Sequence, residues 1–436
     1  AIGTSWRQYW LMERIRSAKG FVRRHRPDYP MIIFVGILLL LGLIVLYAIS
    51  PARTQIINEA GASLDQAHFM QRQLLYLFVG IVAFVVAANV PLKTWQKYAG
   101  KLLVASLLAC VLLAILGFIN APIAQCSLGA CRWFDLGFFN FQPAELVKFG
   151  MLLFLAGFIG RRVQQGKLND VQETMIPLGL LIVSALVLII GVQKDMGTGL
   201  ALLGIVGTML YVAGINKRMG AITLASMVTL GVAFVIIAPH RISRIVTFLG
   251  DTGAVGGAAY HITQAKIALG TGGFFGLGLG KNVQSFGYLP EAPNDSIFAI
   301  MGEAFGFVGL IVILIILVSL LLRLLSIMDR VEDINLRLIV AGVFGWLATH
   351  SLLNIGAMVG AVPLTGITLP LLSFGGTSLL FIMLALGLVF HISRYTVHGK
   401  IKDVNERNES KNSDSGRWLG RSRHSGGGSY QPTRRD

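Results

Sequence analysis

The sequence predicts an all-α membrane protein with ten transmembrane helices and a long extracytoplasmic loop between helices 7 and 8. Of its 436 residues, 54% are hydrophobic and only 13% are charged, and the mean hydropathy is +0.70. Charged residues make up roughly a quarter of an ordinary globular chain. An apolar run of about 20 residues is long enough to cross the bilayer as a helix. Ten such runs lie near 31–50, 73–90, 102–119, 144–160, 175–192, 198–214, 219–239, 297–322, 338–359 and 376–393.

The Lys and Arg residues indicate the orientation of the chain. If the N-terminus is cytoplasmic, ten spans place six segments inside, and these hold 28 of the 37 Lys and Arg residues. The six segments are 1–30, 91–101, 161–174, 215–220, 323–337 and 394–436. Basic short loops mark the cytoplasmic side, so both termini are predicted to be cytoplasmic. The net charge of +16 then reflects topology and attraction to anionic lipid, and no base-reading motif favours nucleic acid.

Two polar ends flank a membrane domain that we assign to residues 30–395. Residues 1–29 carry apolar residues at helical spacing among basic ones, which predicts an amphipathic helix on the inner leaflet. A disordered basic arm is the alternative. Residues 396–436 are polar and rich in Gly, Ser and Arg, so a disordered cytoplasmic tail is predicted.

The outer loop at 240–296 is far longer than a connection requires, and such loops are usually functional. The stretch from His261 to Leu269 is predicted to form a short helix. The glycines between Gly270 and Gly280 allow tight turns and a close approach to a neighbour. The GLGLGK stretch is not a phosphate-binding loop, because Phe275 stands where that motif requires glycine.

The three cysteines have two different settings. Cys110 falls inside the third run and is predicted to be part of the core. Cys126 and Cys131 flank SLGA in an outer loop, where an oxidising exterior would allow a disulfide. Two unpaired thiols are the alternative, and a CxxxxC pair without nearby His is weak evidence for metal.

The stretch YLPEAPNDSIF places Glu291 and Asp295 just before the eighth run. In one interpretation, Asn294 or Asp295 caps the eighth helix. Glu303 lies roughly 12 Å deeper by helical rise, and an ionisable group inside a membrane helix indicates a functional site. In the second interpretation, Asp295 and Glu303 line one outward-facing polar cavity.

The fourth span begins with FQPAELVKFG, where Pro143 suits the first helical turn. Glu145 and Lys148 are i, i+3 neighbours that can pair on one helix face. The alternative is that the Lys148 side chain extends to the membrane surface. The preceding CRWFDLG places Arg132 close to that surface.

The last outer loop, PLTGITLPLLSFGGTS, contains prolines and glycines in apolar surroundings. These residues are predicted to break or re-enter a helix where protein or a cavity supplies partners. A tight structural turn is the alternative.

Taken together, the motifs resemble the SEDS family (shape, elongation, division and sporulation), which includes RodA and FtsW. The resemblance covers about residues 31–395 and rests on FQPAELVK, QKDMGT, HITQAKIALGTGGFFGLGLG, YLPEAPND, IFAIMGEAFGFVG and PLTGITLPLLSFGGTS. It implies a ten-helix peptidoglycan glycosyltransferase that polymerises lipid II outside the bacterial cytoplasmic membrane. YLPEA and GLGLGKNVQ are more similar to FtsW than to RodA, which implies septal cell-wall synthesis during cell division.

The resemblance also implies which residues act. The family's essential aspartate corresponds to Asp295, and the arginine before tryptophan corresponds to Arg132. Its conserved glutamate and lysine of the fourth helix correspond to Glu145 and Lys148. The chain departs from the family pattern at Pro293, Asn294, Ser296, Lys194 and Ala304.

The chemistry implied for the site is transfer of a sugar from a lipid diphosphate to a hydroxyl. A sugar hydroxyl is a poor nucleophile, so Asp295 is predicted to be the general base or to orient the acceptor. Glu145 and Lys148 are predicted to set its environment and complete the catalytic set. The predicted substrate-binding residues are Arg132, Gln264, Lys266, Glu291, Glu303 and Ser373. Cations would stabilise the leaving diphosphate, and Mg²⁺ or Mn²⁺ is expected without an assigned ligand set.

The expected partners are lipid II, the growing glycan strand, a class B penicillin-binding protein transpeptidase and other divisome membrane proteins. Three alternatives to a septal polymerase stay open at this stage. A lipid II flippase would use the same cavity, a RodA-type enzyme would act in elongation, and a non-catalytic scaffold would need only the polar tails.

Overall fold

The computed structural model describes residues 26–396, apart from 60, 62, 128, 129, 138 and 237–256. Two predicted segments fall largely outside this range. These are the amphipathic segment 1–29, of which the last four residues are described, and the tail 396–436, of which only Thr396 is described.

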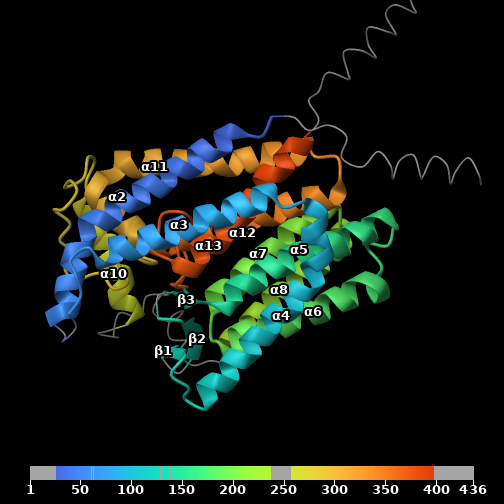
Figure 1. Cartoon of the computed structure of the whole chain (residues 1–436), viewed down its shortest axis with the longest axis horizontal. Helices are drawn as coiled ribbons and strands as arrows, with labels where there is room; N and C mark the ends of the chain where they lie inside the picture. The colour runs from blue at the N-terminus through green and yellow to red at the C-terminus, as the bar shows by residue number, and fades with distance from the viewer. Residues whose placement is uncertain are drawn as a thin grey trace, which may run out of the picture. The chain divides into compact units, whose positions relative to one another are not determined.

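Helices form most of the described chain (Figure 1). Their bounds are α2 Tyr29–Glu59, α3 His68–Asn89, α4 Leu92–Phe118, α5 Pro143–Gln164, α6 Ile176–Leu186, α7 Met196–Ala213, α8 Lys217–Ile236, α10 Ala258–Thr271, α11 Ile297–Arg330, α12 Ile334–Val359 and α13 Gly376–Ile392. Two π-helical segments, Val171–Met175 and Val187–Val192, flank α6, and a 3-10 turn at Ser393–Tyr395 follows α13.

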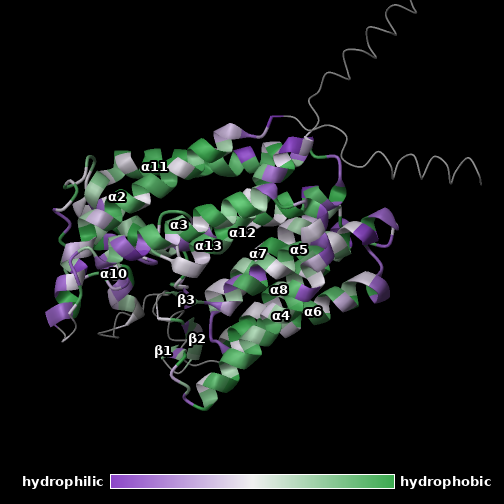
Figure 2. Ribbon diagram, in the orientation of Figure 1, coloured by the Kyte–Doolittle hydropathy of each residue, from purple (hydrophilic) through white to green (hydrophobic). Residues whose placement is uncertain are grey.

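Nine helices of the described chain are long and apolar enough to cross a membrane, and they coincide with nine of the ten predicted runs. The remaining run, 219–239, falls on α8, and its last three residues, 237–239, lie outside the described residues. Figure 2 shows hydrophobic residues along most of the length of these helices, with polar residues nearer their ends. The chain is therefore a multi-pass helical membrane protein.

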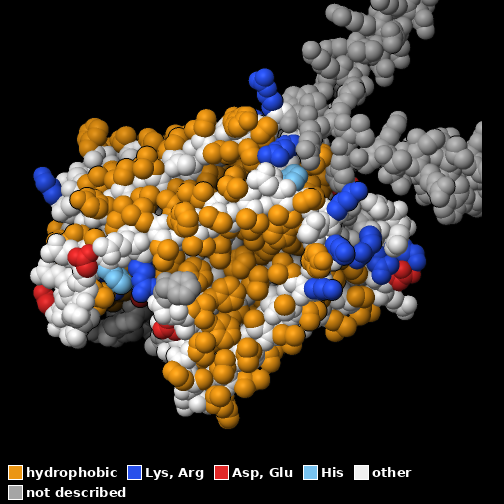
Figure 3. Space-filling view, viewed as in Figure 1, with side chains coloured by type: hydrophobic (Ala, Val, Ile, Leu, Met, Phe, Trp, Pro, Cys, Tyr) orange, Lys and Arg blue, Asp and Glu red, His pale blue; other side chains and the backbone are white. Residues whose placement is uncertain are grey.

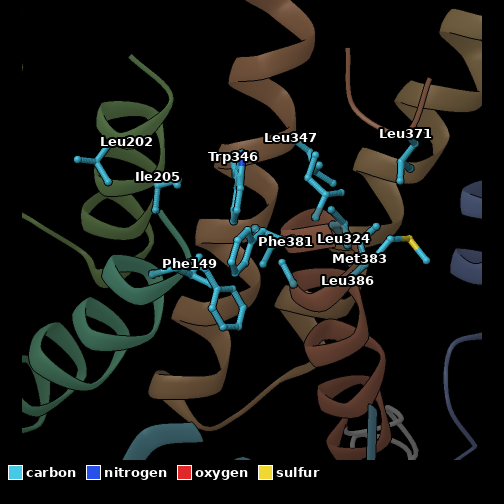
Figure 4. Packing of buried hydrophobic residues seen from close by; sticks show 14 of the residues in the cluster. Phe149, Leu202, Ile205, Leu324, Trp346, Leu347, Leu371, Phe381, Met383 and Leu386 are labelled. Carbon is cyan, nitrogen blue, oxygen red and sulfur yellow. The ribbon is translucent and has the colours of Figure 1, made fainter. Parts of the chain in front are cut away.

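The helices differ in how deeply they are buried by their neighbours. Neighbouring helices bury 78% of the residues in the most apolar stretch of α5, 67% in that of α12 and 78% in that of the helix ending at Tyr395. The corresponding share is 22% in each of α3, α4 and α11. Phe149, Trp346 and Phe381, which come from the three buried helices, meet in the core shown in Figure 4. Side chains on the lipid side of such a fold are apolar and exposed, so polar groups on α5 and α12 face the protein interior.

A small antiparallel sheet, which the sequence analysis did not predict, follows α4. Its strands are β1 Ala124–Ser127, β2 Ala130–Asp135 and β3 Asn140–Phe141, in the order β1-β2-β3. Cys126 pairs with Cys131 across β1 and β2, and the two form a disulfide, as one of the two interpretations predicted. The Cys131 sulfur packs on Gly117, where a Cβ would overlap it, so the sheet is docked on the end of α4. Cys110 is buried in the core, as predicted.

The loop before α11 forms the predicted helix, here α10, and a glycine-rich segment that pairs with α11. Gly306 interrupts α11 with φ 67° and ψ −169°, a conformation restricted to glycine. The glycine-rich segment supplies the hydrogen bonds that the break leaves open, which confirms the predicted close approach. Four backbone bonds of 2.8–3.1 Å join them: Leu277 N to Glu303 O, Gly278 N to Ala304 O, Phe307 N to Gly273 O and Val308 N to Phe274 O.

Candidate functional site

A cavity of about 980 Å³ lies where α5, α7 and α12 meet the small sheet and two loops. The loops are 288–296, which leads into α11, and 361–375, which connects α12 to α13. Four of the predicted site residues line this cavity: Arg132, Glu145, Glu291 and Asp295.

Asp295 is fixed by contacts that its neighbours make with distant parts of the chain. The Asn354 amide on α12 donates to the carbonyl oxygens of both Asp295 and Ile367, each at 2.7 Å. Phe374 N donates to Pro293 O at 2.8 Å, which joins the two loops a second time. Asp295 is 8% exposed, and its carboxylate lies beside Gly366, where a Cβ would be 3.9 Å from Oδ2. The carboxylate therefore faces the cavity from a segment with little freedom to move.

The capping interpretation of this segment is wrong. Ser296 is the N-cap of α11, and no side chain forms a capping hydrogen bond there. The Ser296 hydroxyl instead donates to Pro290 O at 2.9 Å and is hydrogen-bonded to the His261 imidazole of α10. Asp295 is thus not used to start the helix.

A buried ion pair lies on α5. Lys148 Nζ is 2.8 Å from Glu145 Oε1, and the two side chains are 0 and 5% exposed. The predicted pairing is confirmed, and the alternative that Lys148 reaches the membrane surface is wrong. Glu145 Oε2 is buried without a hydrogen-bond partner among the described residues. Glu145 also lines the cavity, so a substrate that enters the cavity comes close to this carboxylate.

His350 and Trp346 of α12 complete the surroundings of Lys148. The Lys148 ammonium is 3.1 Å from His350 Nε2 and 4.8 Å from the centre of the Trp346 ring. Trp346 Nε1 also donates to His350 Nε2, at 3.2 Å. Two donors on one nitrogen require that Nε2 carry the lone pair, which leaves the proton on Nδ1. Nδ1 then donates to Thr368 O at 3.3 Å, so the imidazole connects the ion pair to the loop beside Asp295.

Arg132 enters the cavity from strand β2. Its Nε and Nη2 donate to the backbone carbonyls of Gln193 and Lys194 at 3.0 and 2.8 Å. These bonds use two of its five N–H groups and fix the guanidinium against the turn before α7. Asp195 in the same turn caps α7 and accepts from Gln142 at 2.9 Å. The positive charge of Arg132 is therefore held at the cavity by neutral carbonyl groups.

Glu303 does not share the cavity with Asp295, so that hypothesis is wrong. Its carboxylate accepts from the backbone N–H groups of Val283 and Gln284, at 2.9 and 3.3 Å, and it is 1% exposed. A carboxylate satisfied by backbone donors stabilises the loop that it binds. Its position inside the helix indicated a functional site, but the structure gives the charge a local partner.

Three other predicted binding residues lie away from the cavity lining. The Ser373 hydroxyl accepts from Leu369 N at 2.8 Å within a turn. Lys266 is on the exposed side of α10, with its side chain against Gly360, and Gln264 is half-buried on the same helix. The structure thus brings Asp295, Glu145, Arg132 and Glu291 together and leaves these three apart.

Sequence reasoning missed His350, Trp346 and Asn354. One signal was available for His350, because an ionisable group inside an apolar run indicates a function. Asn354 carried no comparable signal, since its role depends on two loops that meet only in the folded chain.

The described residues contain no group of three or more His, Cys, Asp or Glu side chains placed to hold a metal ion. Mg²⁺ commonly binds one or two carboxylates together with substrate phosphates, and the Asp295 and Glu291 carboxylates at the cavity fit that arrangement.

Comparisons with known proteins match most of this chain to a single family. A family model for cell cycle proteins of the FtsW, RodA and SpoVE type matches residues 29–398. Stage V sporulation protein E of Bacillus subtilis is 34% identical over 376 residues, 86% of this chain and 99% of that protein. A probable peptidoglycan glycosyltransferase FtsW of Aliivibrio salmonicida is 32% identical over 360 residues, 81% of this chain and 86% of that protein.

Solved structures share the fold. A chain from a structural study of polymerization and crosslinking by a peptidoglycan synthase complex superimposes with a TM-score of 0.66 and 26% identity, covering 85% of this chain and 98% of that chain. The rod shape determining protein RodA of Thermus thermophilus gives a TM-score of 0.60 with 26% identity over the same shares. The resemblance stated from the motifs is confirmed, and the chain belongs to the FtsW, RodA and SpoVE family of cell cycle proteins, the SEDS family.

Proposed function

We propose that this chain is a peptidoglycan glycosyltransferase that polymerises lipid II at the outer face of the bacterial cytoplasmic membrane. The observation that carries the proposal is the cavity, where a carboxylate, a buried ion pair and an arginine from separate elements converge. The relatives named as probable peptidoglycan glycosyltransferases support the same activity.

The reaction joins an acceptor sugar hydroxyl to the anomeric carbon of a second lipid-linked sugar. Asp295 takes the hydroxyl proton as the new C–O bond forms. The bond between the anomeric carbon and the diphosphate oxygen breaks, and the diphosphate leaves with the electron pair. Arg132, fixed at the cavity by two backbone carbonyls, stabilises the negative charge on that leaving group.

Glu145 and Lys148 act together rather than as separate acid and base groups. Glu145 Oε2 accepts from a substrate hydroxyl, while Lys148 holds the Glu145 carboxylate in position through its bond to Oε1. Glu291 contacts substrate at the cavity edge. Lys266 and Gln264 are proposed to contact a part of the substrate that extends beyond the cavity, whereas Glu303 and Ser373 serve the fold.

A divalent cation, Mg²⁺ or Mn²⁺, is proposed to arrive with the diphosphate. Asp295 or Glu291 would supply a carboxylate ligand, and the phosphate oxygens and water would supply the others. Bound there, the ion would neutralise charge on the leaving diphosphate.

The proposed topology has ten spans, with α8 as the seventh, and both termini in the cytoplasm. Figure 3 supports this orientation, because Lys and Arg side chains gather at the end of the molecule where α5 connects to α6 in Figure 1. Basic connections mark the cytoplasmic side, which leaves the cavity at the outer end. The site of action is proposed to be the division septum, as the FtsW names of the relatives suggest.

The proposed partner is a class B penicillin-binding protein that crosslinks the strands as they form, within a larger divisome assembly. A similar chain has been solved in a complex that couples polymerization and crosslinking, which supports a crosslinking partner for this chain.

Reconstitution tests the proposed function. The purified protein, with a class B penicillin-binding protein and Mg²⁺ or Mn²⁺, is given labelled lipid II. Wild type is expected to produce a ladder of glycan strands, and folded Asp295→Ala is expected to produce none. Transport of lipid II across sealed vesicles without any ladder would overturn the proposal in favour of a flippase. Rescue of elongation but not of division in cells depleted of each enzyme would move the chain to the RodA type.

A further inference from the structure

The glycine-rich segment that pairs with α11 carries apolar side chains that the described protein leaves exposed, two of them phenylalanines. Phe274 is 71% and Phe275 is 83% exposed, and Leu277 and Leu279 are 40 and 45% exposed. Full burial of one such side chain is worth about 1.5–3 kcal/mol. Two adjacent phenylalanines left in water would be costly, so the position of this segment relative to the membrane matters.

The lipid-facing side of α11 begins where this segment docks. Residues 297–304 of α11 are all buried within the protein. From Phe307 onward, a helical stripe of apolar side chains is 39–59% exposed: Phe307, Val308, Ile311, Val312, Ile315, Val318 and Leu322. The ring of Phe274 packs edge-on against the ring of Phe307, with centroids 6.1 Å apart. Phe274 is therefore level with the outer end of the stripe.

The depth of that contact follows from the inner end of α11. Arg323, whose guanidinium is paired with Asp28 at 2.8 Å, is the first charged residue after Phe307. About 24 Å of helix separate the two residues, less than the hydrocarbon thickness of about 30 Å. With Arg323 at the inner boundary, Phe307 lies in the hydrocarbon of the outer leaflet, and Phe274 lies beside it.

We propose that Gly273–Leu279 is an interfacial anchor that inserts Phe274 and Phe275 among the acyl chains of the outer leaflet. The segment is a part of the predicted outer loop, yet its apolar side chains continue the membrane-facing stripe of α11. Its occupant is lipid, because the neighbouring surface with which it is continuous belongs to a membrane span. A segment of seven residues is too short to cross the membrane, so it lies at the interface.

The anchor has a consequence for the cavity. The four backbone hydrogen bonds between this segment and α11 fix the first turns of α11, which follow Asp295 directly. The height of Asp295 above the acyl chains is thereby set by the anchor. A lipid-linked substrate presents its diphosphate at a fixed height above its own lipid chain. The anchor therefore places the Asp295 carboxylate at the height of the bond that breaks. This consequence rests on the proposed function, whereas the insertion itself rests only on α11 crossing the membrane.

Site-directed spin labelling tests the insertion without any assay of activity. Three variants each carry one cysteine. It replaces Phe275 in the first, Ile315 in the second as a lipid-facing reference, and Lys281 in the third as an exposed control in the same loop. The background is Cys110→Ala, with the Cys126–Cys131 disulfide retained. In nanodiscs of phosphatidylethanolamine and phosphatidylglycerol, each nitroxide is exposed to oxygen, which concentrates in acyl chains, and to a water-soluble nickel chelate.

The logarithm of the ratio of oxygen to nickel collisions is expected to be positive at 275 and 315 and negative at 281. A negative value at 275 would place the segment in water, and low collision with both reagents would mean that protein covers it. Either result would overturn the anchor. If the Phe275→Cys protein does not fold, Leu279→Cys carries the same expectation. A positive value at 275, together with no lipid II polymerisation by the wild-type protein and its partner, would keep the anchor and reject the proposed function.

Discussion

Lys148 carries a charge with no exposed surface in a membrane helix, where an uncompensated charge is costly. Three groups surround its ammonium: the Glu145 carboxylate, the His350 imidazole and the face of the Trp346 ring. A carboxylate, a lone pair and a π-face each stabilise a cation. These three groups together stabilise the buried ammonium. Loss of any one of them should therefore lower the stability of the protein.

Removal of one member of this pair is expected to be worse than removal of both. Lys148→Met leaves the Glu145 carboxylate buried without its cation, which should cost about 3–5 kcal/mol. The double variant Glu145→Gln, Lys148→Met should recover part of that loss. The measurement is the thermal midpoint of each purified protein in detergent, treated as a double-mutant cycle. Additive effects of the two substitutions would show that the pair is not coupled.

Activity is expected to survive a substitution at position 350 only if the new side chain accepts a hydrogen bond. His350→Leu leaves the Trp346 indole N–H and one Lys148 donor unsatisfied, a cost of about 1–3 kcal/mol for a buried group. It should lower kcat by about two- to tenfold if half of that cost falls on the reactive geometry. His350→Gln offers an amide oxygen and should retain most of the activity. Equal turnover by the Leu and Gln variants would deny His350 a role in positioning the ion pair.

The break in α11 explains why glycines gather in the preceding loop. Gly306 adopts a conformation that other residues avoid, and a Cβ there would overlap the backbone of Phe274 and Gly276. The pairing of the two segments replaces helical hydrogen bonds that the break removes. The sequence indicated a close approach but not its partner, because glycine spacing says nothing about which segment lies opposite.

Gly306→Ala is expected to destabilise the protein by at least about 2 kcal/mol through backbone strain and overlap. The matched control is Gly207→Ala in α7, where a Cβ meets nothing within 4 Å. That change should be neutral or stabilising by up to about 1 kcal/mol, since alanine favours a helix. Thermal unfolding of both variants is the measurement. Similar midpoints for the two would mean that the break does not require glycine.

Sequence periodicity predicted the helices well but not the small sheet. Nine runs became helices because a bilayer requires that backbone groups bond within each segment. The strands β1 and β2 are short and lie outside any apolar run, so hydropathy carried no signal for them. The Cys126–Cys131 pair was the one indication of two neighbouring chain segments, and it was compatible with free thiols.

At the scale of the whole molecule, the site depends on convergence that local patterns do not encode. Asp295 is distant along the chain from Arg132 and Glu145, yet all three line one cavity; only the family resemblance grouped Asp295 with the other two. Glu303 was misassigned because its depth in a helix was visible, whereas its backbone partners at Val283 and Gln284 were not. The role of His350 could not be predicted because its bond to Lys148 joins two helices that are distant in sequence.

The proposed topology predicts which side of the membrane each connection faces. Single cysteines at Pro122, after α4, and at Gln164, at the end of α5, are introduced with Cys110→Ala. A third variant carries a cysteine added after Asp436. An impermeant maleimide applied to intact spheroplasts should label only position 122, and permeabilisation should expose the other two. Labelling of the added C-terminal cysteine in intact spheroplasts would contradict an even number of spans.

The central claim is that Asp295 performs the chemistry at this cavity, and two buried carboxylates test it most directly. Asp295→Asn and Glu303→Gln each replace a buried carboxylate by an amide, but only Asp295 lines the cavity. The measurement is kcat for lipid II polymerisation per folded molecule, with the partner present. Asp295→Asn is expected to lower kcat by about 100-fold or more, the contribution of a general base, while Glu303→Gln lowers stability and leaves kcat within about threefold of wild type. Normal turnover by folded Asp295→Asn, or an equal loss in both variants, would contradict the account.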